Sequence, residues 1–83
     1  PYLAPEQFAE GLCAENIKLR SNVPNVPWVK QQAQRELAGY YAMVRNLDWN
    51  VGRLVQALDK LNLADDTYIV FFSDHGDMHG SHG

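Results

Sequence analysis

The chain of 83 residues has one cysteine, no long apolar run and no excess of positive charge. Cys13 has no second cysteine to pair with, and neither neighbour in sequence would activate its thiol, so we predict a packing or surface residue. A formal net charge of −3 without a basic cluster argues against a nucleic-acid partner. The longest apolar run is too short to span a membrane. The first residues also lack the basic start and apolar stretch of a signal peptide.

What is present divides into two parts. Hydrophobic residues make up 46% of the chain, which is ordinary for a folded protein, and 83 residues allow one small domain at most. All four prolines lie in residues 1–28, a segment without a clear hydrophobic period, and we expect it to be an irregular lead-in. Residues 29–83 have a clear pattern, which predicts a helix, a strand and a loop in that order.

The helix is predicted over about residues 29–61. Its apolar side chains recur at steps of three and four, which places them on one face. Asn62 follows the last of them and suits the left-handed position after a helix end. The residues of the apolar face are Ala33, Leu37, Tyr40, Tyr41, Val44, Leu47, Val51, Leu54, Leu58 and Leu61.

A buried strand is predicted over about residues 67–73. Tyr68 to Phe72 are apolar at every position, which is typical of a strand covered on both faces in a parallel sheet. The predicted fold class is therefore α/β. One strand alone leaves its backbone groups unpaired, and one helix cannot cover both of its faces. We therefore expect this unit to be a piece of a larger sheet, or to pair with strands of another chain.

A glycine-rich loop follows the predicted strand and carries most of the chemistry. Asp74 and His75 stand where the strand ends, an edge at which α/β sheets bind ligands, and a carboxylate there is commonly paired with a metal, a helix N-terminus or a basic partner. Both could converge on one divalent cation; the alternative is an Asp that caps the loop beside a packed His. His82 could hydrogen-bond an anionic substrate or act as an acid. The role of Asp77 stays open, and we expect His79 to face solvent.

A second kind of metal site can be drawn from the same loop. His75, His79 and His82 are spaced by four and three residues, which would place them on one face of a helix and could hold a transition metal. The glycines at 76, 80 and 83 argue against a helix there, and no cysteine is near enough to complete a zinc shell.

Residues 37–83 resemble the sulfatases of the alkaline phosphatase superfamily. The resemblance rests on YYAMVRNLDWNVGRL (40–54), LDKLNLADDT (58–67), IVFFSDHGDM (69–78) and GSHG (80–83), which combine a helix, a turn, a strand and a loop motif in order. It implies an α/β sandwich around a mostly parallel sheet and hydrolysis of sulfate esters. It also implies Ca²⁺ or Mg²⁺ beside a formylglycine, with Asp74 and His75 as metal ligands and His82 as a catalytic residue. The substrate would be a sulfated small molecule or glycan.

The departures from that family are large. The formylglycine motif, C/S-x-P/A-x-R, is absent, because Cys13 is followed by Ala14-Glu15-Asn16, and the family's first acidic metal-binding pair is also missing. We therefore predict that residues 1–83 form a single partial domain of a longer sulfuric ester hydrolase, inactive alone. One alternative is a phosphonate monoester or phosphodiester hydrolase of the same superfamily. Another is a non-catalytic assembly module that self-associates through its unpaired strand.

Overall fold

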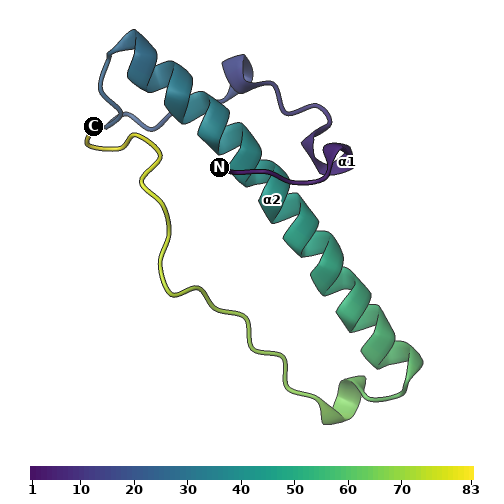
Figure 1. Cartoon of the computed structure of the whole chain (residues 1–83). Coiled ribbons are helices and arrows are strands. Elements are labelled where there is room, and N and C mark those ends of the chain that lie inside the picture. The colour runs from purple at the N-terminus through teal and green to yellow at the C-terminus, as the bar shows by residue number, and fades with distance from the viewer.

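The computed structural model describes residues 1–83, and one long helix, α2 (Pro27–Lys60), dominates it (Figure 1). A single turn of helix, α1 (Glu6–Ala9), and two 3₁₀ turns, η1 (Ala14–Asn16) and η2 (Ala64–Asp66), complete the secondary structure. After η2 the chain runs back along α2 as an extended segment, and its end lies near the start of that helix (Figure 1). α2 occupies the region in which the sequence predicts a helix.

Both ends of α2 follow from local chemistry. Pro27 occupies the first turn, where its missing N–H is not needed, and the extended Val26 precedes it. At the other end Asn62 has φ 56°, the left-handed conformation that the sequence predicts for it. The N–H of Asn62 bonds to the carbonyl of Asp59 at 3.1 Å, and that of Leu63 to the carbonyl of Leu58 at 2.9 Å. These two bonds form a Schellman motif, which satisfies carbonyls at the helix end.

The length of α2 sets the shape of the molecule. A helix of 34 residues is about 51 Å long at 1.5 Å per residue, and the molecule measures 53 × 26 × 19 Å. The radius of gyration is 16.7 Å, whereas a compact domain of this length would have about 12 Å. None of the helices combines the length and apolar composition that a membrane span requires. The chain is therefore elongated, and its other segments lie along one helix without enclosing a core.

The N-terminal segment crosses the middle of α2 and is attached there by polar contacts. The guanidinium of Arg45 donates to the carbonyls of Phe8 (3.3 Å) and Glu10 (2.8 Å). At Gly39 the helix approaches the backbone of Tyr2 so closely that a Cβ would overlap its carbonyl oxygen. A glycine on the helix thus allows residues 1–10 to lie against it.

The most buried part of the molecule lies at the N-terminal half of α2. Five residues are buried, namely Val23, Ala33, Ala42, His79 and Ser81. The last two come from the C-terminal loop, which docks beside the start of the helix. There the N–H of His82 donates to the carbonyl of Asn22 at 3.1 Å. The loop is thereby brought against residues that precede it by more than 40 positions.

The predicted strand over 67–73 does not form, and the prediction of an α/β fold for this chain is wrong. The structure contains no strand, and residues 68–77 make no backbone-to-backbone hydrogen bond. Their apolar side chains are exposed, with Tyr68 100% and Phe72 83% accessible. The physical reason is the lack of a partner, because an extended segment becomes a strand only when a neighbour pairs with its N–H and C=O groups. The sandwich implied by the resemblance is likewise absent from this chain.

Candidate functional site

Asp74 and His75 follow the extended segment, and their side chains turn toward each other. Oδ2 of Asp74 lies 3.6 Å from Nε2 of His75, and the His75 N–H donates to Oδ1 of Asp74 at 3.0 Å. Nδ1 of His75 lies 3.1 Å from the carbonyl oxygen of Gly76. A carbonyl only accepts hydrogen bonds, so in a neutral ring Nδ1 carries the proton and Nε2 has the free lone pair. Two acceptor atoms therefore lie 3.6 Å apart.

This geometry suits two neighbouring ligands of one cation. With ligand bonds of about 2.4 Å, adjacent ligands of an octahedral ion are about 3.4 Å apart, close to the 3.6 Å that separates Oδ2 from Nε2. Both side chains are exposed, and no group of three or more His, Cys, Asp or Glu residues converges anywhere in the chain. Calcium takes six to eight ligands, mostly oxygen. The pair thus fits a divalent cation as part of a shell and does not complete one.

His82 lies at the other end of the loop, beside the lead-in segment. Its Nε2 is 3.3 Å from the side-chain nitrogen of Asn22, whose carbonyl also accepts the His82 N–H. An amide nitrogen donates only, so Nε2 accepts and the proton of the neutral ring is on Nδ1. The backbone of His82 has φ 67°, an uncommon conformation for a non-glycine residue. The side chain is exposed and could donate its Nδ1–H to an anionic oxygen.

His79 is buried, so the prediction that it faces solvent is wrong. Its side chain is 4% exposed and packs against the rings of Tyr2 and Tyr40, with ring centroids 5.1 and 4.7 Å away. Nδ1 lies 4.0 Å from Oε2 of Glu36, and neither ring nitrogen has a hydrogen-bond partner. The periodicity of the helix identified Tyr40 as a packing residue, but no sequence pattern connected Tyr2 or residue 79 with it.

The structure does not bring His75, His79 and His82 together as one transition-metal site. His79 is buried against two tyrosines, whereas His75 and His82 are exposed at separate places along the loop. The helix that their spacing would require does not form, as the glycines of this loop predict.

The carboxylate of Asp77 affects the ionisation of Tyr2 in the N-terminal segment. Partial burial raises the pKa of the Tyr2 phenol, and the Asp77 carboxylate raises it further, as do Glu36 and Tyr40 to a smaller extent. For the two carboxylates the cause is charge, because a nearby negative charge disfavours the phenolate.

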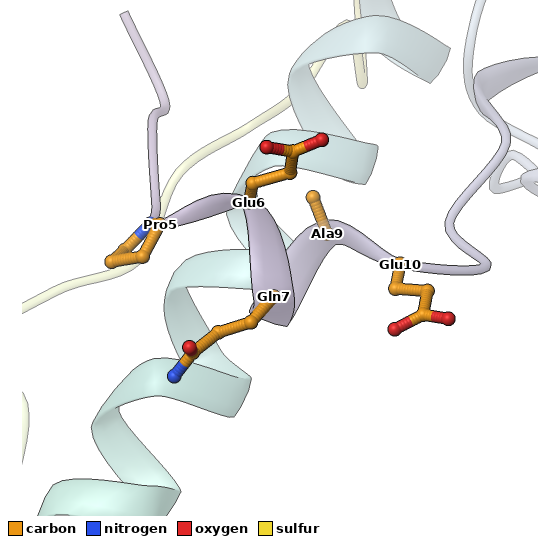
Figure 2. Close-up of a pocket in the computed structure, with 5 residues that line it drawn as sticks. All are labelled: Pro5, Glu6, Gln7, Ala9 and Glu10. Carbon is orange, nitrogen blue, oxygen red and sulfur yellow. The ribbon is translucent and has the colours of Figure 1, made fainter.

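One hollow on the surface is lined by none of these residues. It lies at α1 and is lined by Pro5, Glu6, Gln7, Ala9 and Glu10 (Figure 2). Figure 2 shows the carboxylates of Glu6 and Glu10 pointing in different directions, so they do not converge on one ligand. Two carboxylates would also repel an anion such as a sulfate ester. Cys13, for which the sequence predicts a packing or surface position, is exposed.

Comparison with known proteins places the chain in a family. The sulfatase family profile matches residues 1–83. The ulvan-active sulfatase of Formosa agariphila is 36% identical over 78 residues, which cover 94% of this chain and 15% of that protein. The choline-sulfatase of Rhizobium meliloti is 36% identical over 70 residues, or 84% of this chain and 14% of the relative. No solved structure matches the chain.

A human relative is more similar over a shorter region. Iduronate 2-sulfatase of Homo sapiens is 47% identical over 66 residues, which cover 78% of this chain and 12% of that enzyme. The chain belongs to the sulfatase family, as the motifs in residues 37–83 predict. It spans about a seventh of the length of these curated relatives.

Proposed function

We propose that this chain is part of a metal-dependent sulfatase that hydrolyses sulfate esters. The proposal rests on family membership over the whole chain together with two acceptor atoms, on Asp74 and His75, that lie 3.6 Å apart. The match to only a small share of each relative and the exposed apolar segment before Asp74 support a role within a larger enzyme.

In this proposal Asp74 and His75 supply two ligands to a Ca²⁺ or Mg²⁺ ion. A bound divalent cation would supply Lewis-acid polarisation of the sulfate oxygens. The hydrogen bond from Nδ1 of His75 to the carbonyl of Gly76 keeps the Nε2 lone pair directed toward the ligand position, as outer partners do for metal-binding histidines. The other ligands and the formylglycine nucleophile would come from residues outside this chain.

His82 is proposed to contact the substrate. The amide of Asn22 occupies Nε2, so Nδ1–H is the donor available to an ester or sulfate oxygen. Hydrogen bonds to a charged oxygen are about twice as strong as neutral ones, which suits this donor to an anionic substrate. The relatives are named for ulvan, choline and iduronate, and we propose a sulfated small molecule or glycan as the substrate class.

The test uses the full-length protein that contains this sequence and an aryl sulfate as the probe. We expect turnover that a chelator abolishes and added Ca²⁺ or Mg²⁺ restores. Asp74→Asn and His75→Ala should each raise the half-saturating metal concentration by about 10-fold or more, since each removes a direct ligand. Asp66→Asn, an exposed acid in η2, is the matched control and should change nothing.

Three results would contradict the proposal. They are chelator-resistant turnover, unchanged metal dependence in both variants, or faster hydrolysis of an aryl phosphonate or phosphodiester than of the sulfate. We also expect the 83-residue chain alone to show no turnover with added Ca²⁺, because it supplies two ligands where the ion needs six to eight. Clear activity of the short chain would contradict that expectation.

A further inference from the structure

His79 is held in the structure by packing and not by hydrogen bonds. Its ring packs against the rings of Tyr2 and Tyr40, which also contact each other, and both ring nitrogens lack a partner. Glu36 approaches Nδ1 only to 4.0 Å, which is beyond hydrogen-bond range. A buried polar atom without a partner is unfavourable, so the contacts that keep the ring buried are those of its aromatic faces and edges.

The backbone around His79 is shaped to bring the loop onto α2. His79 and Gly80 both have left-handed backbones, with φ 47° and 82°. A Cβ added at Gly80 would lie 3.1 Å from the Cβ of Ala33, so the loop passes as close to the helix as a glycine allows. The N–H of Ser81 then bonds to the carbonyl of Met78 at 3.0 Å, and His82 reaches Asn22. His79 is the first buried residue of the chain after η2.

We infer that His79 is a positioning residue that attaches the C-terminal loop to α2 and so fixes the place of His82 relative to Asp74 and His75. It stands four residues after His75 and three before His82, between the two groups proposed to hold the metal and the substrate. Its effect on catalysis rests on the proposed function, whereas its effect on the loop does not.

The inference assigns the role of His79 to the packing of its ring and not to its nitrogen atoms. If packing holds the loop, His79→Phe should keep the loop attached, because the phenylalanine ring can fill the same space beside the two tyrosines and removes two unpartnered polar atoms. His79→Ala should detach the loop, because the contact with both tyrosines is lost. If His79 instead transferred a proton, His79→Phe would lose activity as His79→Ala does.

The experiment compares His79→Phe and His79→Ala in the full-length protein, with Met78→Ala as the control. Met78 is the neighbouring residue and is 63% exposed. Amide hydrogen exchange of residues 81–83 reports on the attachment of the loop and needs no activity. Turnover of an aryl sulfate, expressed as kcat per folded molecule together with KM, reports on the placement of His82.

We expect His79→Ala to speed exchange at 81–83 by about 10-fold or more and to lower kcat by about 100-fold, as a displacement near 1 Å can do. His79→Phe and Met78→Ala should stay within about 2-fold of the parent protein on both measures. The inference is overturned if His79→Phe behaves like His79→Ala, or if His79→Ala leaves exchange unchanged. A fall in folded yield at unchanged kcat would overturn the catalytic part. If the parent protein has no sulfatase activity, the proposed function fails and the exchange result still decides the attachment.

Discussion

Single residues decide where the N-terminal segment can lie on α2. At Gly39 the absence of a side chain admits the carbonyl of Tyr2, whereas Gly52, in the same helix, has no atom within 4 Å of the position of a Cβ. The two glycines share a helix and differ in surroundings. One allows a close approach, and the other only loosens the helix.

We predict opposite effects for the same substitution at these two positions. Gly39→Ala should destabilise the 83-residue chain by about 1–3 kcal/mol, because the new methyl group overlaps the backbone of Tyr2. Gly52→Ala should stabilise it by about 0.5–1 kcal/mol through helix propensity alone. Thermal unfolding followed by circular dichroism at 222 nm measures both, and equal shifts at the two sites would contradict the contact described here.

At the same scale, the sequence predicted part of the candidate site and missed part of it. Asp74 and His75 are adjacent in a glycine-rich loop, so their proximity could be predicted without a fold, although their role as ligands stays a prediction. The burial of His79 could not, because it depends on Tyr2, which is 77 positions away and lies in a segment without periodicity. Contacts between segments this distant leave no local pattern.

At the scale of elements, the long helix was predictable because its determinants are local. The apolar spacing, Pro27 at the start and Asn62 after the end all act within a few residues. The strand was not, because a strand is defined by hydrogen bonds to a neighbour and this chain supplies none. The apolar run from Tyr68 to Phe72 is extended and unpaired.

The C-terminal end of α2 offers a test of this local control. Asn62→Ala should lower the stability of the helix by about 1 kcal/mol, since alanine is strained at positive φ, while Asn62→Gly should be neutral or slightly stabilising. Mean residue ellipticity of the 83-residue chain and its thermal midpoint measure the effect. A loss of helix in the glycine variant would show that the asparagine side chain, and not the backbone conformation, ends the helix.

At the scale of the whole molecule, the chain leaves an apolar segment exposed. The side chains of residues 68–72 are 61% to 100% exposed, and the radius of gyration exceeds that of a compact domain. A contiguous exposed surface of this kind marks an interface. In the proposed enzyme the interface would be internal to the protein.

We therefore predict that the 83-residue chain associates with itself as its concentration rises. Val70→Lys should weaken this association by about 10-fold or more, because a charge on an unpaired extended segment opposes pairing. Gln56→Lys, which adds the same charge on an exposed helical position, should have little effect. Sedimentation velocity over a range of concentrations distinguishes these outcomes, and a strictly monomeric parent chain would contradict the prediction.

The extended segment after η2 returns along α2 and ends beside the start of that helix (Figure 1). From residue 67 to residue 79 a fully extended chain reaches about 40 Å at 3.3 Å per residue, and the helix from Ala33 to Lys60 rises about 40 Å at 1.5 Å per residue. Because the two lengths are similar, a deletion of several residues from 68–72 would draw the imidazole at 79 away from its buried position, whereas an added residue could bulge into solvent. Evolution is expected to tolerate a longer segment here more readily than a shorter one.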